Sequence, residues 1–156
     1  MQRTPEIEAF WAAFRAVPGL DHDRYVALEM GDSPELANEL VDLMLAGRKR
    51  ATAALVRDFG GEEPLPEVGD YVVVVDASRT PRCIWRTTEV TIKPLVEVDD
   101  AFAWEEGEGD RSRALWLDAH QRCFARQADR EGFTMHDRMP TVFERFKLVW
   151  PAEAAD

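Results

Sequence analysis

The segment 43–57, LMLAGRKRATAALVR, gathers residue types that can do chemistry together. It carries four bases and no acid, in a chain of 156 residues whose formal net charge is −11. Lys49 and Thr52 follow a glycine closely, so we expect a tight turn to bring the ammonium and the hydroxyl together. A lysine can activate a hydroxyl as a nucleophile when burial and neighbouring cations lower its pKa. Arg48 and Arg50 flank Lys49 and supply such cations, although the same bases would also complement the negative end of a helix.

A second candidate group lies in the acidic stretch 97–110, which holds seven carboxylates and no base. Within it Glu106 stands directly before Gly107, close to a short helix expected around residues 101–104. A carboxylate in that position can project into a cleft, where it can orient the lysine or carry a proton to a leaving group. The alternative is that all seven carboxylates solvate a surface loop.

Trp116 and His120 form a third candidate group, one turn apart on an expected helix whose apolar face also carries Ala119, Cys123 and Phe124. They are candidates for substrate binding, but a histidine flanked by Trp116 and Phe124 is also the pattern of a core residue. No serine or cysteine motif accompanies His120, so a Ser-His-Asp hydrolase is poorly supported. The chain has no Walker-type loop, no GxGxxG motif and no HExxH motif.

Composition narrows the possible ligands and partners. Cys83 and Cys123 do not form a CxxC pair, and with three scattered histidines they do not provide a structural zinc site. We therefore expect no metal and no cofactor, and two reduced, buried thiols. The net charge disfavours bulk nucleic acid and anionic membranes, so neither DNA nor a membrane is an expected partner. The first residues lack a signal-like apolar stretch, and no apolar run approaches the roughly 20 residues of a membrane span, which favours a cytoplasmic protein.

The elements that must position these groups follow from apolar periodicity and from turn residues. Strands joined partly as hairpins, with helices between them and at one end of the chain, indicate a single α+β domain over residues 1–156. Its sheet is expected to be mixed or antiparallel and able to curve into a small barrel. The expected helices cover 5–17, the segment between Ser33 and Gly47, and the segment from Asp110 or Ser112 to about Arg130. The expected strands cover 51–56, 71–76, 82–92 and 141–150, with a loop over 59–70.

Taken together, these motifs resemble the ASCH domain family, whose members have a PUA-like fold. The similarity covers a core from about residue 36 to 150, and the leading helix over 5–17 is similar to that of a longer bacterial branch. The motifs that carry the resemblance are Gly47-Arg48-Lys49-Arg50-Ala51-Thr52, similar to the family's G-x-K-x-x-T, then Ala103-Trp104-Glu105-Glu106-Gly107, Trp116-x-x-x-His120 and Glu144-Arg145-Phe146, in that order.

The resemblance implies a small PUA-like β-barrel with helices packed around it and a cleft lined by the G-x-K-x-x-T turn. In short members that hydrolyse N4-acetylcytidine, the motif lysine, the motif threonine and the later glutamate are the catalytic group. These roles fall on Lys49, Thr52 and Glu106 of this chain. The short members carry an arginine two residues past the threonine, where this chain has Ala54, and Arg57 lies three residues further on. Other ASCH domains are thought to bind or cleave RNA.

Three functions are consistent with these features. The first is an amidohydrolase for an N4-acetylcytidine-like substrate, in which Lys49 activates Thr52 for attack on the acyl carbon and Glu106 carries the proton to the leaving amine. The second is an RNA-binding domain or ribonuclease that uses the basic turn 48–57. The third is a non-catalytic ligand-binding module, which the alanine at position 54 favours. The partner is then a small nucleoside-like ligand or RNA, and the expected substrate-binding residues are Arg48, Arg50, Arg57, Trp116 and His120.

Overall fold

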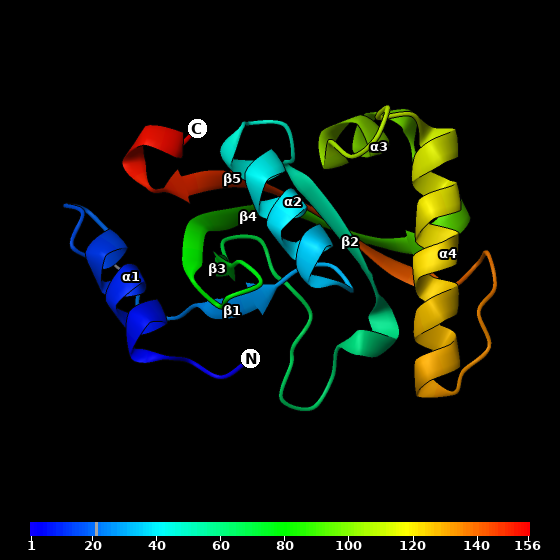
Figure 1. The fold of residues 1–156 in the computed structure, drawn as a ribbon, viewed down its shortest axis with the longest axis horizontal. Coiled ribbons are helices and arrows are strands. Elements are labelled where there is room, and N and C mark those ends of the chain that lie inside the picture. The colour runs from blue at the N-terminus through cyan, green and yellow to red at the C-terminus, as the bar shows by residue number, and fades with distance from the viewer. Residues whose placement is uncertain (21) are drawn as a thin grey trace.

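The computed structural model describes residues 1–20 and 22–156 of the chain (Figure 1). In this part the helices are α1 (Pro5–Arg15), α2 (Pro34–Leu45), α3 (Asp100–Glu106) and α4 (Arg113–Glu131). The strands are β1 (Val26–Glu29), β2 (Ala51–Leu55), β3 (Tyr71–Val75), β4 (Pro81–Pro94) and β5 (Pro140–Trp150).

All four of these helices begin at a polar side chain that accepts a hydrogen bond from the backbone N–H three residues on. The caps are Thr4, Ser33, Asp99 and Ser112. Such a cap satisfies one of the N–H groups that have no partner within the helix, so it fixes where the helix starts. The predicted starts at Ser33 and Ser112 agree with the structure. The first helix ends at Arg15 rather than at residue 17, because the chain already turns before Pro18-Gly19.

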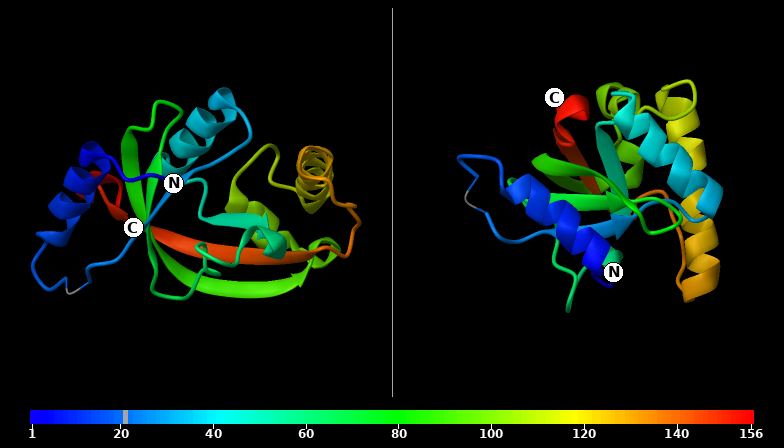
Figure 2. Two further views of the ribbon diagram at one scale, coloured as in Figure 1. Left: turned by 90° about the horizontal axis from the view of Figure 1, so that it is seen from below. Right: turned by 60° about the vertical axis from the view of Figure 1, so that its left-hand side comes forward.

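The five strands form one mixed sheet with the order β1-β3-β4-β5-β2. The β1–β3 pair is parallel, and the other three pairs are antiparallel. The sheet curls strongly, and β4 and β5 form its long bent floor (Figure 2). Among the described residues no strand pairs β1 with β2, so the sheet is a half-barrel with these two strands at its edges. The predicted α+β class with a curved mixed sheet is confirmed.

Strand β3 shows how the sheet is held between helices. Its four valines are all buried, which is the pattern of a strand covered on both faces rather than on one. Because successive side chains alternate, Val72 and Val74 pack into the cluster with α2, whereas Val73 and Val75 pack with Trp11 of α1. Helices α1 and α2 therefore cover opposite faces at this end of the sheet.

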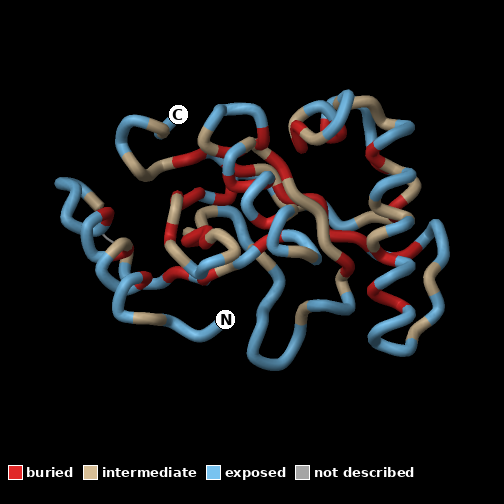
Figure 3. Tube along the Cα trace, in the orientation of Figure 1, coloured by how far each residue is buried: buried red, intermediate tan, exposed pale blue. Residues whose placement is uncertain are grey.

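Helices α3 and α4 cover the other end of the sheet, beside β2 (Figure 1). Phe102 of α3 packs edge-on against Phe143 of β5, with ring centroids 5.0 Å apart, and Trp116 of α4 joins the same apolar cluster. The outer surface of α4 is exposed along most of its length, while the inner face is buried (Figure 3). The last helix thus acts as a wall beside the edge strand β2.

Three features differ from the sequence predictions. Strand β1 was not predicted, because the four residues of Val26–Glu29 are few and show no clear alternation. Ala119, placed on the apolar face of the last helix, is exposed, and Cys123 is only half-buried. The described helices include none that is both long enough and apolar enough to cross a membrane.

Candidate functional site

Lys49 lies in a folded-back turn between α2 and β2. After α2 the chain passes through Gly47 at φ +81°, and the N–H groups of Arg48 and Lys49 both donate to the carbonyl of Leu43, at 2.9 and 3.1 Å. The left-handed conformation at position 47 suits glycine, as expected of a helix end. This turn directs the Lys49 side chain inward, where it is only 1% exposed.

The Lys49 ammonium meets two carboxylates from the segment that ends α3. Nζ lies 3.4 Å from Oε1 of Glu106 and 3.1 Å from Oε2 of Glu108. The Glu106 side chain is 2% exposed, whereas that of Glu108 is 34% exposed and covers the lysine from the solvent side. The structure therefore brings the basic turn and the acidic stretch together, and we name Lys49, Glu106, Glu108 and His120 the charge cluster.

Gly107 allows this close approach. It caps α3 at φ +76°, and a Cβ built at this position would lie 2.4 Å from the carbonyl oxygen of Arg48. No side chain fits there without moving the 48–49 backbone. In addition, the Arg50 N–H donates to the carbonyl of Glu105 at 2.7 Å. The end of α3 is thus seated directly on the turn that carries the lysine.

His120 closes the charge cluster from α4. Its Nδ1 lies 2.8 Å from the carbonyl oxygen of Trp116, and its Nε2 lies 3.2 Å from Oε2 of Glu106. His120 Nε2 is the polar group beside this buried oxygen, which has no other donor among the described residues. The imidazole also stacks on the Trp116 ring, with centroids 3.7 Å apart. His120 therefore belongs to the charge cluster, and Trp116 belongs to the core beneath it.

Charges within the charge cluster shift the pKa values of Glu106 and His120. Burial alone would raise the pKa of Glu106, but the attraction of Lys49 and His120 outweighs it and leaves that pKa below its ordinary value. Burial would likewise lower the pKa of His120, but the Glu106 carboxylate outweighs it and raises that pKa. Glu106 is accordingly an ionised carboxylate, able to accept a proton.

A cavity of about 680 Å³ lies between β1 and β2, where the half-barrel does not close. This volume is typical of sites for small molecules. Thr52, Ala53 and Ala54 line it in succession, so it follows the free edge of β2, with Cys123 and Phe124 of α4 as the facing wall. His120 precedes these two α4 residues by three and four positions, and its ring meets that of Phe124 at a centroid distance of 5.8 Å. The charge cluster therefore continues the α4 wall of the cavity by one helical turn.

Glu144 of β5 is the buried carboxyl that lines this cavity. Two donors converge on one of its oxygens, Oε2: the Thr87 hydroxyl at 2.6 Å and the Trp85 indole N–H at 3.2 Å. The other oxygen, Oε1, has no hydrogen-bond partner among the described residues and is not fully enclosed by protein. Burial raises the pKa of Glu144, against the lowering effect of the Thr87 and Trp85 hydrogen bonds.

Thr52 lies with Glu144 rather than with Lys49. The two residues are register partners in the β2–β5 pair, and both line the cavity. None of the hydrogen bonds of the described residues joins Thr52 to Lys49 or to Glu106. The physical reason is alternation: in an extended segment, residues separated by three positions point to opposite faces. The structure thus brings Lys49 and Glu106 together and leaves Thr52 on the cavity side.

The arginines of the basic turn have separate partners within the protein. Arg48 donates to the carbonyls of Gly107 and Gly109, at 2.8 and 2.9 Å. The Arg50 guanidinium donates to both carboxylate oxygens of Asp156, each at 2.9 Å, and Arg57 lies over the ring of Phe133 at 3.6 Å. None of the three lines the cavity. The cations that flank Lys49 in sequence point away from it in the structure.

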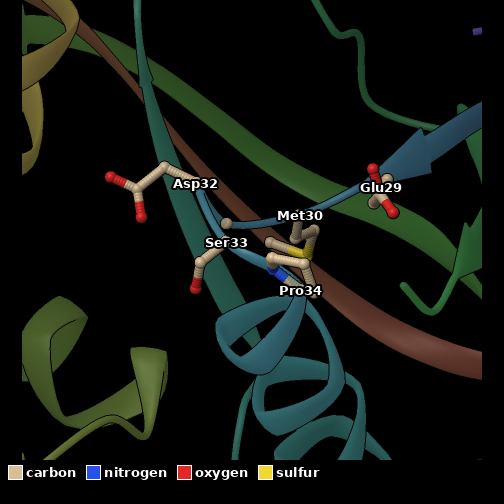
Figure 4. A pocket seen from close by; sticks show the side chains of 6 residues that line it. Glu29, Met30, Asp32, Ser33 and Pro34 are labelled. Carbon is tan, nitrogen blue, oxygen red and sulfur yellow. The ribbon is translucent and has the colours of Figure 1, made fainter.

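The connection between β1 and α2 forms a smaller hollow of about 260 Å³ next to the cavity (Figure 4). Residues 29–32 line both spaces. Asp32 in this connection pairs with Arg126 of α4 at 2.8 Å. This ion pair joins the two sides of the molecule that the open edge of the sheet leaves apart.

Possible metal ligands are dispersed in the structure. Over residues 1–20 and 22–156 no three histidine, cysteine or acidic side chains are placed to hold a metal ion. Cys83 is buried against Met44, whereas Cys123 faces the cavity, and both are free thiols. The expectation that both thiols are buried is wrong for Cys123, because it lies on the side of α4 that borders open space.

Two functional candidates were missed by sequence reasoning. Glu108 is one of seven similar carboxylates, and nothing in its immediate sequence marks it as the partner of Lys49. Glu144 belongs to a motif that the family resemblance includes, but its contacts depend on the register of β4 and β5. An acid between aromatic residues of a strand, in VFERF, was the available signal.

Taken together, these features define a PUA-like α+β domain, a curved mixed sheet with helices packed around it and a motif turn seated against α3. The ASCH domain model matches residues 26–150, so the chain belongs to the ASCH domain family. The predicted family and PUA-like fold are thereby confirmed.

Solved structures agree with this assignment. An ASCH domain from Lactobacillus crispatus JV V101 is 30% identical, with a TM-score of 0.82, over 90% of this chain and 92% of that one. Protein EF3133 from Enterococcus faecalis V583 is 32% identical, with a TM-score of 0.83, over 92% of this chain and 88% of that one. The hypothetical protein PH0355, at 10% identity and a TM-score of 0.52, shares the fold alone. No curated protein matches the chain.

Proposed function

We propose that this ASCH domain is an amidohydrolase that removes the acyl group from an N-acylated aminopyrimidine nucleoside such as N4-acetylcytidine. The observation that carries the proposal is the buried pair of Lys49 and Glu106, 3.4 Å apart and at most 2% exposed. A buried ion pair contributes little net stability and is costly to break, so a structural role alone is a weak reason to keep one. Its position one turn beyond the cavity wall supports a role in chemistry.

The surroundings of Lys49 favour a role as a cation rather than as a base. Glu106 and Glu108 face its ammonium, whereas the flanking cations Arg48 and Arg50 are bound elsewhere. An ammonium fixed at this place can stabilise the negative oxygen that develops when an acyl carbon is attacked. Because Glu108 is the exposed partner, it is the group that a substrate carbonyl would displace.

The reaction balances with water as the only co-reactant. The Glu106 carboxylate takes a proton as a water oxygen bonds to the acyl carbon, and the carbon–nitrogen bond then breaks as that proton passes to the departing amine. The products are the free amino nucleoside and acetate. Thr52, on the cavity side, is suited to hold the substrate or the attacking water, and direct attack by its hydroxyl remains the alternative that substitution distinguishes.

The test is release of cytidine from N4-acetylcytidine, followed by chromatography. Glu106→Gln and Lys49→Met should each lower kcat/KM by at least about 100-fold, since a general base alone contributes roughly that factor. Thr52→Val should abolish turnover if the hydroxyl attacks, and should mainly raise KM if it holds the substrate. Glu131→Gln and Lys147→Met, which alter exposed charges, are the matched controls. A Lys49→Met protein that is folded and fully active would contradict the proposal.

RNA binding is a second candidate, because the ASCH family is associated with it and one surface feature favours it. Trp104 is 57% exposed, and the Arg111 guanidinium lies 3.9 Å from its ring centroid. An exposed aromatic ring with cations beside it is the usual platform for an unpaired base. In a gel shift with single-stranded RNA at low salt, Trp104→Ala should weaken binding at least about fivefold, whereas Leu115→Ala, which removes another exposed apolar side chain, should not. Equal binding by wild type and Trp104→Ala would contradict this candidate.

A further inference from the structure

The cavity between β1 and β2 contains a polar group that the proposed chemistry does not use. Glu144 is 8% exposed, yet one of its carboxyl oxygens is free. Oε1 is the accessible oxygen of a side chain that is otherwise buried and held in place, so it offers a fixed acceptor to a ligand in the cavity. The Thr87 and Trp85 donors hold Oε2 and so fix the orientation in which Oε1 meets the cavity.

The rest of the cavity indicates the shape and charge of the ligand. Phe59 and Phe124 line it and supply apolar surface. Among the described residues seven carboxylates line the cavity, against two arginines, Arg3 and Arg130. A site with this excess of negative charge repels anions, and its carboxylate oxygens accept hydrogen bonds from N–H and O–H donors.

We infer that Glu144 is the specificity-determining residue of this cavity, and that its Oε1 accepts a hydrogen bond from a hydroxyl of an uncharged aminopyrimidine nucleoside, while the surrounding carboxylates exclude the phosphorylated form. Thr52, its neighbour across the β2–β5 pair, supplies the second polar contact. This inference rests on the proposed function for the identity of the nucleoside, whose acylated nitrogen is left to the charge cluster. It adds the group that recognises the nucleoside and the charge state that the site accepts.

The experiment is isothermal titration of the intact chain with cytidine and with cytidine 5′-monophosphate at low salt, which needs no turnover. Cytidine should bind, and the monophosphate should bind at least about tenfold more weakly, because its phosphate meets a negative site. Equal or tighter binding of the monophosphate would overturn the charge argument. Absence of cytidine binding at millimolar concentration would overturn the inference as a whole.

Three variants test whether cytidine affinity depends on Glu144 itself or only on the overall charge of the protein. In Glu144→Gln the amide oxygen can take the Thr87 and Trp85 hydrogen bonds, which turns the NH₂ group toward the ligand, so cytidine affinity should fall at least about tenfold. Glu39→Gln makes the same charge change at an exposed residue outside the cavity and should alter affinity less than about twofold. The Thr52 hydroxyl has no hydrogen-bond partner among the described residues. Thr52→Val therefore tests the second contact without removing a bond that stabilises the fold. Unchanged affinity in folded Glu144→Gln would refute the role of Glu144.

Failure of this inference is distinguishable from failure of the proposed function. If wild type binds cytidine through Glu144 but releases none from N4-acetylcytidine, the hydrolase proposal fails and the binding site stands. If wild type hydrolyses N4-acetylcytidine and Glu144→Gln does so with an unchanged KM, the role of Glu144 fails and the hydrolase stands.

Discussion

Glu106 and Glu144 are both buried glutamates beside the same open edge of the half-barrel, yet their surroundings differ in kind. Glu106 faces an ammonium and an imidazole, so its charge is compensated and its pKa lies below the ordinary value. Glu144 faces a hydroxyl and an indole, which are neutral donors, so burial prevails and its pKa is raised. Two carboxyls whose environments move their pKa values apart are suited to different tasks. In the proposed function the compensated one carries the proton, and the other recognises the substrate.

The two sites also differ in the parts of the fold that hold them in place. The charge cluster is held by a backbone approach that only glycine allows and by contacts from α2, α3 and α4. The Glu144 site depends on side chains of β4 and β5, which the sheet holds regardless of any ligand. The first should therefore be sensitive to substitution, and the second should tolerate it.

Removal of the Lys49 ammonium is expected to have the largest effect. Lys49→Met leaves Glu106 buried without its main partner, so the free energy of unfolding should fall by about 3–5 kcal/mol, as measured by urea denaturation. Adding Glu106→Leu to this variant should restore most of the loss, because the uncompensated carboxylate is then gone. Lys147→Met, at an exposed position, should change stability by less than about 0.5 kcal/mol. A loss below about 1 kcal/mol for Lys49→Met would show that the pair is not a buried, coupled unit.

A comparison of two glycines measures how closely the cluster is packed. Gly107 and Gly132 both cap helices at φ +76°, but only at Gly107 would a Cβ meet backbone, 2.4 Å from the Arg48 carbonyl oxygen. Gly132→Ala should cost about 1 kcal/mol for the left-handed conformation alone. Gly107→Ala should cost at least about 3 kcal/mol and should also lower hydrolysis, because α3 must move off the turn. Equal losses in the two variants would remove the argument for close packing.

Acid should weaken the charge cluster selectively. Because the pKa of Glu106 is lowered in the folded protein, its contribution to stability is present above its ordinary value of 4.5 and is lost as pH falls through the folded pKa. The difference in unfolding free energy between wild type and Glu106→Gln should therefore shrink from about pH 6 to about pH 3. His120 behaves in the opposite sense: its raised pKa gives stability that is full below 6.5 and is lost as pH rises through the folded value. A constant difference across this acid range would contradict the lowered pKa of Glu106.

The smallest effect is expected at Glu144. Glu144→Gln keeps an acceptor for the Thr87 and Trp85 donors and removes the cost of burying a charge, so stability at neutral pH should change by less than about 1 kcal/mol. Because the pKa of Glu144 is raised in the folded protein, any stability linked to its protonated form is present below pH 4.5. That stability is lost as pH rises through the folded pKa. Destabilisation of the variant by more than about 2 kcal/mol would place Glu144 among the groups that hold the fold.

The sequence was sufficient for most of the architecture because local rules govern it. Ser33 and Ser112 cap their helices as predicted, and the run of valines in β3 is a strand whose two faces are both covered. Strand β1 escaped prediction because its four residues owe their conformation to pairing with β3, a contact that is distant in sequence. Local patterns carry no information about such a partner.

The site was predictable only in part. The family resemblance grouped Lys49, Thr52 and Glu106, and the structure has Lys49 and Glu106 3.4 Å apart. The resemblance could not show that Thr52 turns to the other side of β2. Likewise, the two arginines that flank Lys49 have separate partners: Arg48 donates to a pair of carbonyls, and Arg50 donates to a carboxylate. The spacing of residues along the chain determines which residues are neighbours in sequence. The direction of each side chain depends on strand alternation and on elements that are distant in sequence.

The most direct test of the account is an NMR titration of the glutamate side-chain carboxyl carbons, with Glu106→Gln and Glu144→Gln to assign the two signals. The account predicts that Glu106 titrates below the ordinary value of 4.5 and Glu144 above it. Addition of cytidine should perturb the Glu144 signal more strongly than the Glu106 signal. Titration of Glu144 at or below the pH at which Glu106 titrates would contradict the division of tasks between the two carboxyls.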